Sequence, residues 1–273
     1  MRSFLIGASV SAAALVALGS GCGPALAQGD DMQFAGTIGA GWTDYLTSGD
    51  VHTNDWLASG AAVLTLDNPG FDVQANFNNS DLQVPGKSSD LWSYGGDVYW
   101  RDYAGNIGIN ANFESAVTNG TGVLGGTTIA EDTYGWFGQW FARPNLTFEI
   151  KGGRFEGHFE GLYGDVGAVF YPYHDIALSL TSDYAEAEHV REQLRDAMFT
   201  AEYLPVHDVP VSVYLGYDYS LVSALPHQQV SALMVGLKAY LGGGGRNGTL
   251  VDYQRNGTTN WDGAPAGLVE LGF

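Results

Sequence analysis

Hydrophobic and polar residues alternate strictly over many short stretches of the chain. Within Val211–Tyr219 the odd positions are apolar or aromatic, whereas the even positions include Ser212 and Asp218. Because successive side chains of a β-strand leave on opposite faces, this stretch predicts a strand with one apolar face and one polar face. The same alternation occurs in Phe71–Asn78, Ile107–Glu114 and Leu146–Lys151.

Short turns recur along the chain at intervals of about 35 residues. They contain Pro, Gly, Asn and Asp, which favour tight turns, and lie at 68–70, 104–106, 143–145, 173–175 and 206–208. Longer and more polar connections alternate with these turns, at 46–54, 79–90, 118–131, 153–159, 185–193 and 221–228. The segment 185–194 is a candidate for a short helix within one of these connections.

The alternation and the turns together predict twelve strands. Their approximate cores are 33–45, 56–66, 71–78, 91–102, 106–116, 133–142, 146–153, 160–171, 176–184, 195–204, 210–220 and 229–241. Because twelve is an even number, we expect both ends of the sheet to lie on the side of the short turns.

The composition indicates where the apolar faces point. Charged residues make up 15% of the sequence, whereas soluble domains carry about 25%, and aromatic residues make up 13%. After residue 27 no apolar run reaches the length of about 20 residues that a membrane helix needs. Low charge, many glycines and a period of two predict an all-β fold, namely a transmembrane antiparallel up-and-down β-barrel. Its short turns would be periplasmic and its longer loops extracellular.

Aromatic residues gather near both ends of the predicted strands, which is typical of the aromatic girdles at the two membrane interfaces. Those near the short turns are Tyr103, Tyr171, Tyr173, Tyr203 and Tyr240. Those near the longer loops are Trp42, Tyr45, Trp56, Trp92, Tyr184, Tyr217 and Tyr219.

The N-terminus has the features of a secretory signal peptide. Arg2 precedes an apolar run, and Ala25–Ala27 supplies the small residues that signal peptidase reads, which predicts cleavage before Gln28. A lipoprotein signal at Cys22 is the alternative, although the usual Leu three positions earlier is missing. Because Cys22 is the only cysteine, the mature chain cannot be stapled by disulfides.

The charge of the mature chain is strongly negative. Without Arg2, 10 basic residues remain of the 11 in the whole sequence, against 30 acidic ones, which gives a net charge of 10 − 30 = −20. This charge argues against nucleic acid and anionic surfaces as partners.

The leader, the hairpin repeat, the alternating strands and the terminal Phe273 together resemble Gram-negative outer-membrane β-barrel proteins of the porin type. The resemblance covers nearly the whole mature chain, and Val269, Leu271 and Phe273 look like the C-terminal signal read by the barrel assembly machinery. It implies a location in the bacterial outer membrane, contact with membrane lipid and lipopolysaccharide, passage of small solutes, and no cofactor.

The C-terminal part departs from this pattern. A run of four glycines begins at Gly242, and the last stretch after Pro265 has about eight residues, short of the roughly 9–11 that a spanning strand needs. We therefore divide the chain into a signal peptide (1–27), a barrel (28–241) and a periplasmic tail (242–273). The alternatives are that the tail folds back into the pore, or that it adds two strands to make fourteen.

The polar faces of the strands are the candidate lining of a pore. They carry more acids than bases, and rings of carboxylates favour cations, although these charges could instead pair across strands and fill the lumen. Twelve strands lie between the filled eight-stranded barrels and the open ones of 16–18. The prediction is a narrow porin-like channel for passive diffusion of ions and small hydrophilic solutes, with a preference for cations. The candidate pore-lining residues are Asp72, Gln74, Asn76, Asp97, Arg101, Asn110, Asn112, Glu114, Arg143, Glu149, Lys151, Asp165, Asp183, Glu202, Asp218 and Lys238.

Two other functions are weighed against the channel. A structural or adhesive barrel would act through acidic loops, with Asp44, Asp50 and Asp55 as candidates for binding divalent cations. A lipid hydrolase would need a nucleophile, a base and an orienting group, and no spacing brings such a set together. We therefore predict no enzyme, no metal site and no cofactor. The residues considered for the hydrolase are His158, His189 and His227 with Ser182, Ser220 or Ser223, whereas His174 and His207 are interpreted as turn formers.

Overall fold

The computed structural model describes most of the chain from residue 33 to residue 259. The described residues are 33–48, 52–66, 69–84, 87–120, 127–157, 160–188, 193–206, 209–223, 228–242 and 248–259. The predicted signal peptide lies outside these ranges, as does the C-terminal stretch from residue 260.

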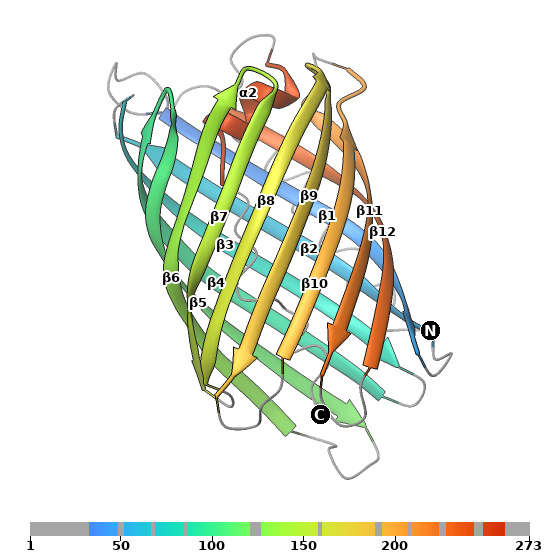
Figure 1. Ribbon diagram of the computed structural model, residues 1–273. Coiled ribbons are helices and arrows are strands. Elements are labelled where there is room, and N and C mark those ends of the chain that lie inside the picture. The colour runs from blue at the N-terminus through green and yellow to red at the C-terminus, as the bar shows by residue number, and fades with distance from the viewer. Residues whose placement is uncertain are drawn as a thin grey trace.

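The described residues form twelve antiparallel strands that close into one barrel (Figure 1). Each strand pairs with the next along the chain, and the last pairs with the first, so the sheet has no open edge. This architecture confirms the predicted all-β up-and-down barrel of twelve strands. The strands are β1 (Gln33–Thr47), β2 (His52–Thr65), β3 (Gly70–Val84), β4 (Lys87–Asp102), β5 (Gly105–Gly120), β6 (Thr127–Arg143), β7 (Leu146–Gly157), β8 (Gly161–Tyr173), β9 (Ile176–Ala187), β10 (Gln193–Tyr203), β11 (Val211–Val222) and β12 (Gln228–Gly242).

Several strands continue into segments that the sequence pattern assigned to loops. β3 and β4 pair up to Val84 opposite Lys87, within the predicted connection 79–90. The expected helix at 185–194 is wrong in its described part, since Ala185 pairs with Leu194 in the β9–β10 ladder. The reason is that two flanks of one hairpin satisfy each other's backbone hydrogen bonds, so pairing extends beyond the alternating region.

The two faces of the strands have opposite chemistry. On β11, Leu215 is 53% exposed on the outside, while its neighbours on the other face, such as Ser212, are buried inside the barrel. On β5, Ile107 and Ile109 are likewise exposed, and Asn110 is buried. The apolar face therefore points outward and the polar face inward, the reverse of a soluble barrel.

The exposed aromatic residues match the expected girdles in part. Trp56, Trp92 and Tyr217 are exposed near the long-loop end, and Tyr103 and Tyr173 near the short turns. The girdle prediction is wrong for two other residues at the short-turn end, Tyr171 and Tyr240. Both are buried on the inward face, because they contact a helix inside the barrel.

This helix, α2 (Leu250–Asn256), lies within the barrel at the end where the short turns are (Figure 1). β12 ends at Gly242, whose φ of 69° suits glycine and whose missing side chain leaves room for the carbonyl of Phe34. The helix begins with a capping box, in which Thr249 and Asp252 each bond the other's backbone N–H. Part of the predicted periplasmic tail therefore folds back into the lumen, which was one of the alternatives considered.

Within the described part of the chain, no helix has both the length and the apolar character needed to cross a membrane.

Candidate functional site in the barrel lumen

The inward faces of the strands bring the predicted pore-lining residues together. All of them except Arg143 lie on these faces, where their side chains are buried or half-buried. Arg143 is exposed at the end of β6, next to the turn to β7, and its backbone carbonyl accepts a hydrogen bond from α2. Its side chain therefore does not belong to the inward-facing set, because the strand ends at this residue.

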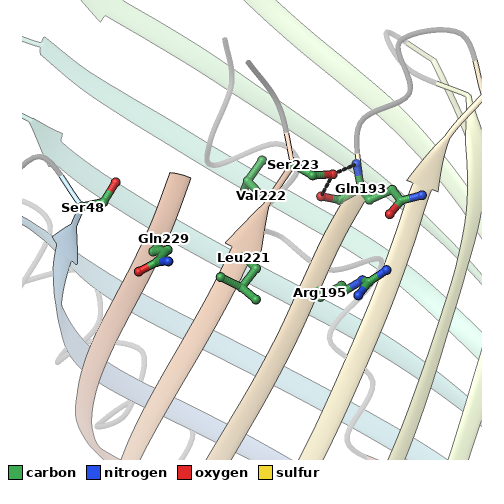
Figure 2. A pocket seen from close by; sticks show the side chains of 7 residues that line it. All are labelled: Ser48, Gln193, Arg195, Leu221, Val222, Ser223 and Gln229. Atoms are coloured by element: carbon green, nitrogen blue, oxygen red, sulfur yellow. Dashed lines mark hydrogen bonds between the residues drawn. The ribbon is translucent and has the colours of Figure 1, made fainter. Parts of the chain in front are cut away.

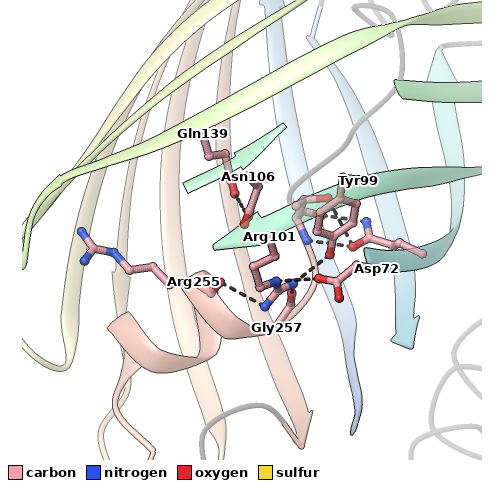
Figure 3. Close-up of polar contacts among 9 residues, drawn as sticks. Asp72, Tyr99, Arg101, Asn106, Gln139, Arg255 and Gly257 are labelled. Atoms are coloured by element: carbon pink, nitrogen blue, oxygen red, sulfur yellow. Dashed lines mark hydrogen bonds and ion pairs between the residues drawn. The ribbon is translucent and has the colours of Figure 1, made fainter. Parts of the chain in front are cut away.

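At the short-turn end, a buried ion pair joins β3 and β4. The Arg101 Nε lies 2.5 Å from an Asp72 carboxylate oxygen, and both side chains are almost fully buried. The same guanidinium donates to the Tyr99 hydroxyl at 2.8 Å and to two carbonyls of the α2 segment, those of Arg255 at 3.1 Å and Gly257 at 2.7 Å (Figure 3). Asp72 thus fixes an arginine whose other donors bind Tyr99 and the segment that contains α2.

A second buried carboxylate lies on the other side of the same mouth. Glu202 accepts hydrogen bonds from the Ser212 hydroxyl at 2.5 Å and from the Tyr240 hydroxyl. Its other oxygen lies 3.7 Å from the Lys238 ammonium and accepts from the Gln254 amide at 3.0 Å. Lys238 thus compensates the charge of Glu202. The same carboxylate also binds α2 through Gln254.

Three residues of α2 that the sequence analysis did not single out make much of the contact with the wall. Tyr253 stacks on Tyr240 with ring centroids 4.9 Å apart. Gln254 accepts a hydrogen bond from the Tyr171 hydroxyl at 2.8 Å. Arg255 lies over the rings of Phe141 and Tyr171, at 4.9 and 5.5 Å from their centroids. The spacing of Thr249 and Asp252 in a capping box was the sequence signal that could have revealed this helix.

The burial of α2 also affects the titration of its tyrosine, Tyr253. Desolvation, together with the neighbouring Asp252 carboxylate, raises the pKa of the Tyr253 phenol above its usual value. The phenol is therefore neutral at physiological pH and contributes no charge to the lumen.

Next to the helix, a belt of amides and one carboxylate follows the wall over β3–β6. Gln74 donates to Asn76 at 2.7 Å, and Asn76 donates to Asp97 at 3.0 Å. Four polar atoms along this part of the wall are buried yet have no hydrogen-bond partner among the described residues. They are the Asp97 Oδ1, the Asn110 Nδ2, the Asn112 Oδ1 and the Thr133 Oγ1.

Nearer the long-loop end, one row of the sheet carries a concentration of carboxylates. Lys151, Asp165, Asp183 and Asp196 are directly paired in register across β7, β8, β9 and β10. The Lys151 ammonium lies 3.4 Å from Asp165. Asp218 of β11 contacts Asp196, so four acids adjoin one base. Asp196 is not among the predicted pore-lining residues, although it lies on the same face of its strand as the predicted Glu202.

Those residues considered for the two alternative functions that the structure describes do not come together in one site. Asp44 and Asp55 lie in β1 and β2 rather than in loops, and Asp55 is buried against Ser80 on the inward face. Ser182 is exposed on the outside of β9, whereas Ser220 is buried inside the barrel. His174 is exposed in the β8–β9 turn. The positions Asp50, His158, His189, His207 and His227 lie outside the described residues.

Across the described residues, no group of three or more His, Cys, Asp or Glu side chains is arranged to hold a metal ion.

A separate pocket of about 620 Å³ lies at the rim of the barrel, at the long-loop end of β10–β12 (Figure 2). Arg195, Leu221 and Gln229 line it from the outward faces of these strands. Arg195 also lies 5.9 Å from the ring centroid of Tyr184. The pocket therefore lies at the rim of the barrel, where these outward-facing residues meet the buried Val222.

Comparisons with known proteins agree with this architecture. No family model and no curated protein matches the chain. Among solved structures, an outer membrane channel from Pseudomonas putida F1 aligns with a TM-score of 0.55 and 8% identity, over 77% of this chain and 95% of that one.

Two further structures are similar at lower scores, which carry no argument of their own. The KdgM porin has a TM-score of 0.48 and 11% identity, over 74% of this chain and 98% of that one. The translocator domain of the autotransporter NalP from Neisseria meningitidis has a TM-score of 0.46 and 11% identity, over 87% of this chain and 97% of that one. With its closed sheet and its likeness to the Pseudomonas putida channel, the chain has the fold of porin-like outer-membrane β-barrel proteins.

Proposed function

We propose that the protein is an outer-membrane channel for passive diffusion of ions and small hydrophilic solutes. The observation that carries the proposal is a set of buried polar atoms in the lumen that have no partner within the described part of the chain, such as those of Asp97, Asn110 and Thr133. Buried polar atoms in native proteins are almost always hydrogen-bonded, to protein or to water. Water inside the barrel would satisfy them, and a hydrated lumen is what a diffusion channel requires.

A preference for cations is the second part of the proposal. At the short-turn end, Asp72 and Glu202 are each compensated by a basic side chain. The carboxylate row nearer the long loops, formed by Asp165, Asp183 and Asp196 with Asp218 beside it, contains only the Lys151 ammonium as a base. Carboxylates along a pore wall favour cations over anions. This row is therefore the proposed origin of the selectivity.

The proposed location is the bacterial outer membrane. The apolar outward face, exemplified by Ile109 and Leu215, and the exposed aromatic residues at both strand ends support it. In this location, lipid and lipopolysaccharide would surround the barrel, and the signal peptide and the C-terminal Phe273 would serve export and assembly.

The channel is tested by refolding residues 28–273 and inserting the protein into a planar bilayer. We expect stepwise ion currents that depend on the protein. Heat-modifiable migration on gels verifies beforehand that the barrel has formed. A folded barrel that gives no current would overturn the proposed channel.

A further inference from the structure

The segment 248–259, which contains α2, crosses the whole width of the short-turn mouth. At one end the Leu250 N–H donates to the carbonyl of His174, in the turn between β8 and β9, at 3.0 Å. At the other end the Thr259 N–H donates to the Gln74 side chain on β3 at 2.8 Å. β3 and β9 are six strands apart in either direction around the closed sheet, so they lie on opposite walls. The segment therefore spans the mouth from wall to wall.

The wall holds the C-terminal end of the helix through Arg101. The last carbonyls of a helix lack partners within it, and a cation there also interacts favourably with the helix dipole. Arg101 donates to the carbonyls of Arg255 and Gly257, and its buried ion pair with Asp72 fixes its direction. Figure 3 shows this guanidinium between the helix end and the Asp72 carboxylate.

The helix in turn holds the wall through Arg255. Its guanidinium donates to the carbonyls of Arg143 at 2.7 Å and Leu146 at 3.1 Å, at the turn between β6 and β7. Its Nε donates to the Thr147 hydroxyl at 3.2 Å. Together with the rings of Phe141 and Tyr171, these groups bind the arginine on the side of the mouth away from β3.

Most of these contacts are polar, and water can replace them. Leu250 and Tyr253 are the buried apolar side chains that the helix contributes. A helix of seven residues is far below the length of about 12–15 at which isolated helices become even marginally stable. The segment therefore keeps its fold only while the wall holds it, and loss of a few contacts would release it.

We infer that the segment 248–259 is a resident plug, which narrows the short-turn mouth and must move aside for the channel to reach its full conductance. The inference rests on the proposed channel function and adds a gate to it. In the seated state, solutes would pass beside α2, and the gate would open as the contacts of Arg101, Arg255 and Glu202 are lost.

A redox-controlled crosslink tests the gate directly. Thr37 of β1 and Thr258 of the plug are hydrogen-bonded through their hydroxyl oxygens, 3.1 Å apart. The mature chain contains no other cysteine, so T37C/T258C would form one defined disulfide between wall and plug. We expect the oxidised protein to stay in a low-conductance state, and reduction to restore larger openings. The single variant T37C is the control, and its conductance should not respond to reduction.

A second variant weakens the plug without altering the wall. Y253A/R255A removes the ring stacked on Tyr240 and the three hydrogen bonds that Arg255 donates. We expect a several-fold larger mean conductance. R154A is the matched control, because Arg154 pairs with Glu156 on the outer face of β7, away from the lumen.

The outcomes separate the gate from the channel. Currents that are the same in oxidised and reduced T37C/T258C, and in Y253A/R255A and wild type, would overturn the plug and leave the channel intact. Folded barrels that carry no current in any of these states would instead overturn the channel itself.

Discussion

Arg101 of the barrel wall and Arg255 of α2 join the helix to the wall by hydrogen bonds in both directions. The Arg101 guanidinium donates to the backbone carbonyl of Arg255 at 3.1 Å, while the Arg255 guanidinium donates to the carbonyls of Arg143 and Leu146. Each arginine thus satisfies backbone acceptors of the other element. This exchange joins a C-terminal segment to strands more than a hundred residues earlier, at the mouth of the proposed channel.

Replacing Arg101 with Ala should destabilise the barrel strongly. The change leaves the Asp72 carboxylate buried without its cation, and breaking a buried ion pair in this way costs about 3–5 kcal/mol. Chemical denaturation of the refolded protein in detergent measures the loss. The exposed pair of Arg154 and Glu156 supplies the control, since R154A should cost about 0–1 kcal/mol. Equal losses in the two variants would show that the Arg101 pair has no special role.

The helix cap should control the local stability of the plug. Thr249→Ala removes the side chain that accepts the Asp252 N–H, and loss of such a cap costs about 1 kcal/mol. Hydrogen exchange at the amides of 250–256 should therefore become several-fold faster, while exchange in the strands stays the same. Ser231→Ala, at the far end of β12, is the control and should leave α2 unchanged. Unaltered exchange in T249A would mean that the wall alone holds the helix.

The orientation of the faces predicts opposite effects of a lysine on the two sides of the wall. Leu215→Lys places a charge on the outward face, which costs about 2–4 kcal/mol near the bilayer midplane. Met198→Lys places the same charge on the inward face, paired in register with Asp218, where it should be tolerated. The yield of folded barrel in lipid vesicles distinguishes the two. Similar yields would contradict the assignment of the apolar face to lipid.

Ion selectivity should depend on the carboxylate row. D196N/D218N replaces two adjacent carboxyl groups of the inward face with amides, so the preference for cations should fall. The ratio of cation to anion permeability in a bilayer measures the effect. D132N is the matched control, because Asp132 is exposed on the outside of β6. A permeability ratio unchanged in D196N/D218N would remove the row as the source of selectivity.

The faces could be predicted from sequence because they follow from a period of two, and the strand count because turns of Pro, Gly, Asn and Asp separate the alternating stretches. Alternation is a local property, so the sequence alone is enough to place Asp72 and Asp97 on the inward side. The ends of the strands could not be predicted in this way. Pairing beyond the membrane, as at Val84 and Lys87, depends on the opposite strand and needs no apolar pattern.

The contents of the lumen are harder to predict, because they depend on contacts between distant parts of the chain. Position near the strand ends assigns Tyr171 and Tyr240 to the girdle, although Tyr171 shares the face of Asp165 along β8. Alternation therefore indicates that Tyr171 points inward, but it does not identify the partner in α2. The helix itself lies in a polar segment whose stability comes from the wall, so hydrophobic periodicity could not reveal it.

The most direct test of the proposed function is the reversal potential of the refolded residues 28–273 in a bilayer with a salt gradient. We predict a protein-dependent current whose reversal potential has the sign of cation preference. The reason is that the carboxylate row contains four aspartates and one lysine. A reversal potential of the opposite sign would contradict the assigned selectivity. A folded barrel without current would contradict the channel.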